Sequence, residues 1–165
     1  MRIIIGLGGN VGAVRAAFEG AVEALRENDG LEIISRSSLY RTAPVGPEQP
    51  DYLNAAILVA ADFCPRDLLS LCHRIEANDG RDRSKEQRWG PRTLDIDLLI
   101  SDSVVCRGPA LELPHPRLSE RAFALIPTAE LAPEWIHPLE GQTLAVLAGK
   151  AAEGNPNAVE RIGDW

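Results

Sequence analysis

Apolar runs and amphipathic segments follow one another along this chain and predict alternating strands and helices. Residues 2–7 form an almost continuous apolar run, which is typical of a buried strand. The next segment, from about 12 to 28, predicts a helix. Within it Phe18, Val22 and Leu25 recur at i, i+4 and i+7, which gives the helix one apolar face. The N-terminal part of the chain therefore predicts a strand followed by a helix.

The same periodicities predict further elements, separated by two loops. Strands are expected over residues 31–41, 53–61 and 94–101, a short strand near 104–106, and helices from Pro65, over 119–131 with a bend near Pro127, and over 143–150. Prolines, glycines and polar residues mark loops over 42–50 and 78–93. The order β-α-β-β-α-β, followed by additional elements, predicts an α+β protein with a ferredoxin-like core, in which helices flank a mostly antiparallel sheet.

The composition is that of an ordinary globular protein and limits the class. With 165 residues, of which 45% are hydrophobic and 25% charged, the chain predicts a single domain over residues 1–165. No stretch approaches the roughly 18 uninterrupted apolar residues of a membrane span, so no membrane partner is expected. Three cysteines without a CxxC pair predict free thiols in a reducing compartment, and we expect a cytoplasmic protein.

The charged residues indicate the kind of ligand. A net charge of −7 argues against nucleic acid as a partner. The basic residues are unevenly placed, however, because four arginines and Lys85 lie between residues 81 and 92. Guanidinium groups bind phosphate oxygens in pairs, so this cluster indicates a small polyanion such as a nucleotide. The alternative is a solvated loop in which Asp82 and Glu86 offset the positive charge.

Two acids follow this basic segment in the run Leu94-Asp95-Ile96-Asp97-Leu98. In a strand the three apolar side chains would face one core layer, and both carboxylates would share the opposite face. Two ionised carboxylates that close repel each other unless a cation lies between them, and hard oxygen ligands favour Mg²⁺. The alternative is a sheet edge with two solvated acids. Beside the arginines, the acids predict a site for a metal–nucleotide complex.

Two further clusters could hold a flat ligand or its phosphates. Tyr52 offers a ring face, and Asn54 offers a paired donor and acceptor, although an asparagine in a turn is the commoner case. His115 lies between two prolines, and Arg121 and Phe123 follow near the start of a helix, where anions are favoured. The alternative for His115 is a surface turn, and the alternative for Phe123 is core packing. Trp89 either closes over a flat ligand or anchors its loop, while His73 and His137 are expected to be structural or solvated.

Other catalytic motifs are absent from the sequence. There is no G-x-x-x-x-G-K-[ST] segment and no G-x-S-x-G segment, which argues against a P-loop kinase and a serine hydrolase. Glycines stand at positions 6, 8 and 12, whereas a dinucleotide-binding fingerprint would need one at position 11, where Val11 stands. We expect the glycines near the N-terminus to form a tight connection between strand and helix.

Taken together, five parts of the chain closely resemble the family of 6-hydroxymethyl-7,8-dihydropterin pyrophosphokinases of folate biosynthesis. The matching segments are LGGN at 7–10, SLYRTAPVG at 38–46, QPDYLNA at 49–55, RWGPRTLDID at 88–97, and PHPR at 114–117 continuing to RAF at 121–123. They span nearly the whole chain in the family's order, and the RWGPRTLDID run is very specific. The resemblance implies transfer of a pyrophosphoryl group from ATP to the hydroxymethyl oxygen of the pterin, which leaves AMP.

The resemblance also implies roles for individual residues. Asp95 and Asp97 would hold two Mg²⁺ ions, and Arg81 and Arg92 would stabilise the transferring phosphates. Pterin binding is assigned to Thr42, Val45, Tyr52, Asn54, Trp89 and Phe123, and ATP binding to Arg83, Arg88, Leu98, His115 and Arg121. ATP and the pterin are the implied partners, with contact to neighbouring folate-pathway enzymes left open.

Two other functions remain as alternatives. A non-catalytic pterin- or nucleotide-binding module would be expected to lack Asp95, Asp97 or Arg92, and all three are present. A kinase of similar architecture would transfer one phosphoryl group and make ADP. The nucleotide product, AMP or ADP, distinguishes these functions.

Overall fold

A computed structural model of the chain describes residues 1–44, 48–80, 90–154 and 159–165. Strands and helices alternate over most of this length, as the periodicity predicts. The elements are β1 (Arg2–Gly9), α1 (Val14–Arg26), β2 (Leu31–Arg36), β3 (Leu39–Thr42), β4 (Tyr52–Ala61), α2 (Pro65–Asn78), β5 (Asp95–Ser101), the 3₁₀ turn η1 (Leu118–Glu120), α3 (Ala122–Leu131), α4 (Leu144–Gly154) and β6 (Glu160–Gly163).

The strands form one sheet in the order β5-β1-β4-β3-β6, and β2 also pairs with β4. Every strand pairing in the described part of the chain is antiparallel. The first and last strands of the β-α-β-β-α-β unit, β1 and β5, are neighbours, and β4 lies on the other side of β1. This arrangement confirms the predicted α+β, ferredoxin-like core.

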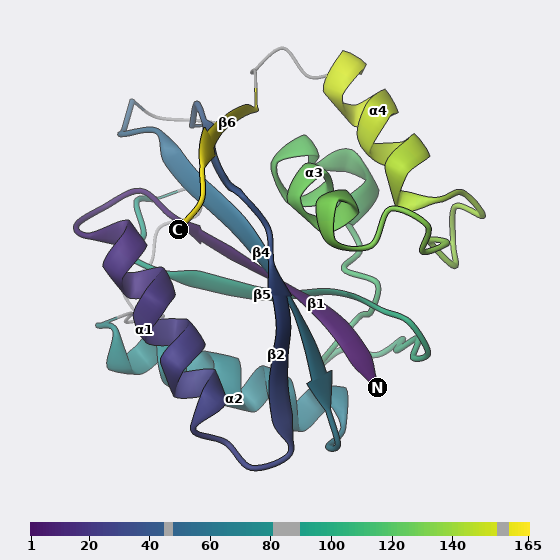
Figure 1. The fold of residues 1–165 in the computed structure, drawn as a ribbon, viewed down its shortest axis with the longest axis horizontal. Coiled ribbons are helices and arrows are strands. Elements are labelled where there is room, and N and C mark those ends of the chain that lie inside the picture. The colour runs from purple at the N-terminus through teal and green to yellow at the C-terminus, as the bar shows by residue number, and fades with distance from the viewer. Residues whose placement is uncertain (45–47, 81–89, 155–158) are drawn as a thin grey trace.

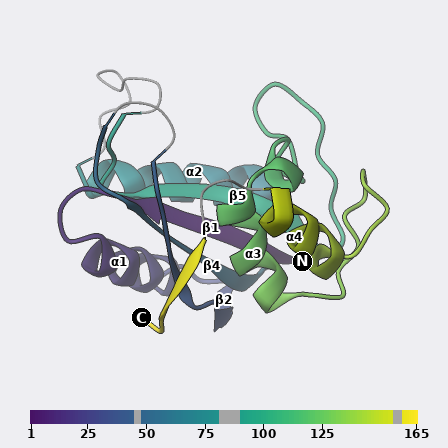
Figure 2. The ribbon, with the colours of Figure 1, turned by 90° about the horizontal axis from the view of Figure 1, so that it is seen from above.

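Helices cover both faces of the sheet. Helices α1 and α2 lie on one face and α3 and α4 on the other, as the two views show (Figures 1 and 2). Because strand side chains alternate, Ile3 and Ile5 join the core beneath α1 and α2, while Ile4 joins the core beneath α3 and α4. Burial on both faces explains the continuous apolar run in β1. None of the helices within the described ranges combines the length and apolar character needed to cross a bilayer.

The strand expected over 31–41 is two strands, β2 and β3, with a break at Ser37. There the backbone N–H of Ala56 donates to Oγ of Ser37 at 2.8 Å, while N–H of Ser37 donates to the carbonyl of Ala56 at 2.9 Å. A side-chain oxygen thus replaces one backbone partner, and the strand can change direction without leaving an amide unsatisfied. Alternation of apolar and polar residues carries no signal for such a replacement.

Three other expectations about the C-terminal half need correction. Residues 104–106 form no strand, because Cys106 makes only an isolated bridge with Leu113. The helix expected from 119 begins at Ala122, after η1, and includes Pro127. The tail, for which no element was expected, contains β6, which pairs with β3 at the sheet edge.

Candidate active site

A cleft of about 420 Å³ lies on the face of the sheet that α3 covers. Its floor is formed by β1, β4 and β5, and its walls by the ends of β3 and β4 and by the segment around η1 and α3. The lining residues are Gly6, Leu7, Gly8, Thr42, Ala43, Tyr52, Asn54, Ala55, His73, Arg92, Asp95, Asp97, Leu99, His115, Arg117, Leu118, Arg121, Phe123 and Ala124. Most of the described residues to which the sequence assigns a role therefore meet in one hollow.

Glycines of β1 make the floor of this cleft. In the sheet register Gly8 lies between Asp95 and Asn54, and Gly6 lies between Asp97 and Ala56. A Cβ atom at Gly8 would stand 3.5 Å from Oδ1 of Asn54, on the same face as the lining side chains. The expectation of a tight connection is wrong for Gly6 and Gly8, which lie inside β1, whereas Gly12 lies between β1 and α1 with a φ of +74°. The missing side chain of Gly8 leaves open space between Asp95 and Asn54, whereas a Cβ at Gly6 would come within 3.0 Å of the Leu99 side chain.

The two acids share the cleft face of β5, as the alternation predicts. Asp95 and Asp97 line the cleft, whereas Leu94, Ile96 and Leu98 are buried in the core beneath α1 and α2. The side chain of Leu98, which was expected to contact ATP, is therefore turned away from the cleft and is not among its lining residues.

Neighbouring groups hold β5 and its first acid in place. Nη1 of Arg92 donates to Oδ2 of Asp95 at 2.6 Å, and both side chains are about one quarter exposed, at 26% and 25%. On the outer edge of β5, the fully buried Glu76 of α2 accepts a hydrogen bond from the backbone N–H of Ile96 at 2.8 Å. The strand that carries both acids is thus fixed from α2 as well as from β1.

His115 and Arg121 form the opposite, basic wall. The backbone N–H of His115 donates to the carbonyl of Leu99 at 2.7 Å, which attaches this segment to β5. Burial, with Arg121 and Arg117 nearby, lowers the pKa of His115 to about 4, so the ring is neutral near pH 7. Its Nδ1 accepts from the backbone N–H of Arg117 at 3.1 Å, which leaves the proton on Nε2. His115 can therefore donate a hydrogen bond to an anion without titrating.

Arg121 keeps its charge between the acids and an aromatic ring. Burial, followed by Arg117, lowers its pKa, while Asp97 and Asp95 act in the opposite direction. The guanidinium carbon lies 5.8 Å from the centre of the Phe123 ring. In the cleft, the guanidinium of Arg121 therefore lies near the opposite charges of Asp95 and Asp97.

Tyr52, Asn54, Thr42 and Phe123 form the other end of the cleft. Nδ2 of Asn54 donates to Oγ1 of Thr42 at 2.9 Å, and both residues are buried. Oη of Tyr52 donates to the carbonyl of Gly90 at 3.0 Å, and burial is the main cause that raises its pKa. Asn54 lies within β4 and not in a turn, and Phe123 lines the cleft instead of filling the core. This end offers ring faces and a polar edge to a planar molecule.

Two residues at the site were missed by the sequence reasoning. Asn10 is buried, and its Nδ2 donates to Oε1 of Gln49 and to the carbonyl of Pro50, both at 3.0 Å. Its Oδ1 accepts from the backbone N–H of Arg92 at 2.9 Å. Asn10 therefore joins the segment before Tyr52 to the segment that carries Arg92, and the motif LGGN was its only signal.

The second missed residue is His73, which was expected to be structural or solvated. It lines the cleft from α2, on the exposed side of that helix and next to the buried Cys72. Its exposure agrees with the expectation of a solvated side chain, and its place in the cleft lining adds it to the candidate site.

Five other assigned residues, Val45, Arg81, Arg83, Arg88 and Trp89, lie outside the described residues. Within the described ranges, no group of three or more His, Cys, Asp or Glu side chains could hold a metal ion. The acidic residues that line the cleft are Asp95 and Asp97. Two carboxylates suit Mg²⁺, which is usually bound in proteins through one or two of them, with phosphates and water completing the shell.

Comparisons with known proteins agree on one family. Residues 4–133 match the sequence model described as 7,8-dihydro-6-hydroxymethylpterin-pyrophosphokinase (HPPK). Curated proteins named 2-amino-4-hydroxy-6-hydroxymethyldihydropteridine pyrophosphokinase are similar along most of their length. The one from Methylorubrum extorquens is 40% identical, covering 98% of this chain and 98% of that protein. The one from Synechocystis is also 40% identical, covering 87% of this chain and 73% of that protein.

Solved structures show the same fold at low identity. The crystal structure of Plasmodium falciparum HPPK-DHPS wild type with SDX-DHP aligns with a TM-score of 0.67 and 15% identity. The alignment covers 92% of this chain and 44% of that chain, so this chain spans less than half of the solved protein.

Proposed function

Because this chain belongs to the 7,8-dihydro-6-hydroxymethylpterin-pyrophosphokinase family, we propose that its cleft is where pyrophosphate passes from ATP to the pterin. The activity is that of an ATP-dependent diphosphotransferase of folate biosynthesis, which acts on 6-hydroxymethyl-7,8-dihydropterin. The observation that carries the assignment is the placement of Asp95 and Asp97 on one side of the glycine floor and of Asn54 on the other.

The acidic and basic end of the cleft would bind the triphosphate. Asp95 and Asp97 would hold Mg²⁺, and we propose two ions because two carboxylates stand side by side along the cleft. Bound Mg²⁺ supplies positive charge that neutralises the phosphates and polarises their oxygens. Arg92 and Arg121 add guanidinium donors, and neutral His115 donates from Nε2 to a phosphate oxygen. Arg81, Arg83 and Arg88 would add further donors from the segment outside the described residues.

The aromatic end would bind the pterin. Tyr52 and Phe123 would face the two sides of its ring system, since flat aromatic ligands gain from such stacking. Asn54 and Thr42 would pair with its polar edge, exchanging their mutual 2.9 Å hydrogen bond for bonds to the ligand. We assign Val45 to the same edge and Trp89 to closure of the site, although both lie outside the described residues. Leu98 could meet ATP only through its backbone, because its side chain is buried.

No side chain needs to act as a nucleophile in this reaction. The hydroxymethyl oxygen of the pterin forms a bond to the β-phosphorus and loses its proton, while the bond from that phosphorus to the α–β bridging oxygen breaks. The electron pair of the broken bond leaves with AMP, so negative charge grows on the bridging oxygen. Catalysis therefore requires positioning and positive charge at that oxygen, which Arg92 and Arg121 would provide.

We also propose that residues 1–165 work as one domain in the cytoplasm, without a membrane or nucleic-acid partner. Cys64, Cys72 and Cys106 are unpaired, which suits a reducing compartment. The HPPK-DHPS chains, in which the matching part makes up less than half the length, support a proposal of contact with a neighbouring folate-pathway enzyme.

One assay tests the activity and its alternatives. The protein is incubated with ATP, Mg²⁺ and 6-hydroxymethyl-7,8-dihydropterin, and the nucleotide product is identified by chromatography. AMP formed in equal amount to the pterin diphosphate supports the proposal. ADP would indicate single phosphoryl transfer, and binding of both substrates without any product would indicate a binding module. An EDTA-treated sample serves as the metal-free control.

A further inference from the structure

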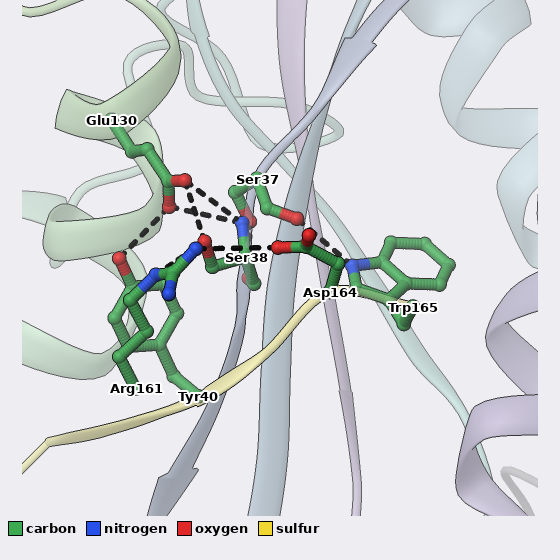
Figure 3. A network of polar contacts seen from close by, with 7 residues as sticks. All are labelled: Ser37, Ser38, Tyr40, Glu130, Arg161, Asp164 and Trp165. Atoms are coloured by element: carbon green, nitrogen blue, oxygen red, sulfur yellow. Dashed lines mark hydrogen bonds and ion pairs between the residues drawn. The ribbon is translucent and has the colours of Figure 1, made fainter.

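The carboxylate of Glu130 in α3 accepts hydrogen bonds from β3 and from Ser38, the residue just before that strand. Glu130 accepts hydrogen bonds from the backbone N–H of Ser38 at 3.1 and 3.0 Å and from Oγ of Ser38 at 2.7 Å. It also accepts from Oη of Tyr40 at 2.8 Å. Figure 3 shows the Ser38 and Tyr40 groups converging on the Glu130 carboxylate. A single side chain therefore connects α3 to Tyr40 of β3 and to the residue that precedes the strand.

The C-terminal segment also donates hydrogen bonds to Ser37 and Ser38 (Figure 3). In β6, Nε of Arg161 donates to Oγ of Ser38 at 2.7 Å, and Arg161 lies opposite Tyr40 in the β3–β6 pairing. Farther along, Nε1 of Trp165 donates to the carbonyl of Ser37 at 3.0 Å. The Trp165 ring packs edge-on against Phe18 of α1, with centroids 5.5 Å apart. The C-terminal segment therefore also holds β3 and the two serines before it.

The tie connects two walls of the cleft. Phe123 precedes Glu130 by seven residues on α3, which is two helical turns, so both lie on one side of the helix about 10 Å apart along its axis. On the other wall, Tyr40 lies opposite Asn54 in the β3–β4 pairing, and Thr42 follows on the same strand. A shift of α3 relative to β3 would therefore move the Phe123 ring relative to the edge formed by Asn54 and Thr42.

The distance between the Phe123 ring and a ligand bound at the Asn54–Thr42 edge decides how well that ligand is held by stacking. Carbon atoms attract best at about 3.5–4.0 Å, and an extra gap of about 0.5–1 Å removes a quarter to a half of that attraction. Rotation or sliding of α3 by such an amount would weaken every contact between Phe123 and the ligand at once.

The hydrogen bond from Tyr40 to Glu130 persists throughout the neutral pH range. Burial and the Glu130 carboxylate raise the pKa of Tyr40 to about 12, so its hydroxyl remains a donor.

We propose that Glu130 is a positioning residue for the pterin. Glu130 fixes α3, and with it Phe123, at a set distance from the edge formed by Asn54 and Thr42. The inference rests on the proposed function, in which these residues form the pterin end of the cleft. The ATP end depends less on Glu130, because Asp95 and Asp97 lie on β5 and His115 is attached to that strand through the carbonyl of Leu99. Arg121, the N-cap of α3, is the residue of this end that would move with the helix. The effect should therefore appear mainly in the KM for the pterin.

The test compares Glu130→Ala, Glu130→Gln and Tyr40→Phe with Glu134→Gln, which removes an exposed acid just beyond α3. Steady-state kinetics would give kcat and the KM of each substrate, and thermal unfolding would report folding. We expect Glu130→Ala to raise the pterin KM about tenfold, which corresponds to ~1.4 kcal/mol. Tyr40→Phe should raise it about threefold, and Glu130→Gln, which keeps an acceptor oxygen, should recover part of the loss. Glu134→Gln should match the parent protein.

An unchanged pterin KM in folded Glu130→Ala and Tyr40→Phe proteins would overturn the inference, even if both unfold at lower temperature. If Glu130→Ala does not fold, Tyr40→Phe decides the question alone. Phe123→Ala separates this outcome from failure of the proposed function. A raised pterin KM in Phe123→Ala with normal kinetics in the Glu130 and Tyr40 variants would refute only the positioning role. A normal pterin KM in Phe123→Ala would refute the assigned pterin end itself.

Discussion

Replacing Gly8 by alanine should separate the stability of the protein from its activity. Gly8 lies inside β1 with a backbone that other residues adopt readily, and a Cβ there would be 3.5 Å from Oδ1 of Asn54 and 4.0 Å from Cβ of Asp95. These are ordinary van der Waals distances, so no neighbour must move. Because glycine inside a strand costs roughly 0.5–1 kcal/mol relative to alanine, Gly8→Ala should be as stable as the parent or slightly more so.

The same methyl group would stand about 1.5 Å above the cleft floor, one carbon–carbon bond length. A ligand that spans from Asp95 to Asn54 would be lifted by a comparable amount. Since a misplacement of about 1 Å can cost on the order of 10²-fold in rate, we expect kcat/KM to fall by about that factor. The thermal midpoint should rise by no more than about 2–4 °C, the shift typical of 1 kcal/mol in a protein of this size.

Two further alanine substitutions serve as controls for Gly8→Ala. Gly20 is exposed on α1 with open space around its Cβ position, so Gly20→Ala should raise stability by ~1 kcal/mol and leave kinetics unchanged. At Gly9 a Cβ would come within 2.4 Å of the carbonyl oxygen of Thr93, so Gly9→Ala should lower stability. Parent-like kinetics in folded Gly8→Ala would refute the assignment of β1 as a floor that the substrates touch.

Three other predictions concern the acids, Asn10 and His115. Asp97→Asn should stay folded and lose at least about 10²–10³-fold in kcat, and a Mg²⁺-responsive variant with normal turnover would contradict the metal role. Asn10→Ala leaves the backbone N–H of Arg92 without its side-chain acceptor, so it should lower the free energy of unfolding in urea by ~1–3 kcal/mol. It should also raise the KM of both substrates, because Asn10 joins the segment before Tyr52 to the segment that carries Arg92. A rise for only one substrate would argue against this linking role. Because the pKa of His115 falls from 6.5 to about 4 on folding, the unfolded chain takes up the proton first. Stability should therefore decrease as the pH falls from 6.5 towards 4, and His115→Asn should reduce this decrease when urea midpoints at pH 7 and pH 5 are compared.

Strand periodicity alone locates much of the site. The alternation in 94–98 predicts that Asp95 and Asp97 share one face, and the structure confirms that both line the cleft while Leu94 and Ile96 are buried. Such patterns succeed because the direction of a strand side chain depends only on its position along the chain. The order of elements likewise predicts the sheet, since few connections of these elements are physically allowed.

What the sequence does not reveal depends on contacts between distant residues. Ser37 breaks a strand because its hydroxyl oxygen, instead of a backbone carbonyl, accepts the hydrogen bond from an amide of β4, and β6 exists because residues near the C-terminus pair with β3. Asn10 shows the same limit, because its partners at 49, 50 and 92 are remote in sequence. A sequence pattern reflects only the residues close by in the chain, whereas the roles of Ser37, β6 and Asn10 depend on residues that are distant in sequence.

The outer side of β5 has a consequence for the protein in concentrated solution. An edge strand usually presents unpaired amides and carbonyls that can recruit a strand from another molecule. Here Glu76 occupies the amide of Ile96 and the backbone of His115 occupies the carbonyl of Leu99. Glu76 and the backbone of His115 therefore also prevent β5 from pairing with a strand of another molecule. A variant that loses these hydrogen bonds would become prone to aggregation as well as to misplacement of Asp95 and Asp97.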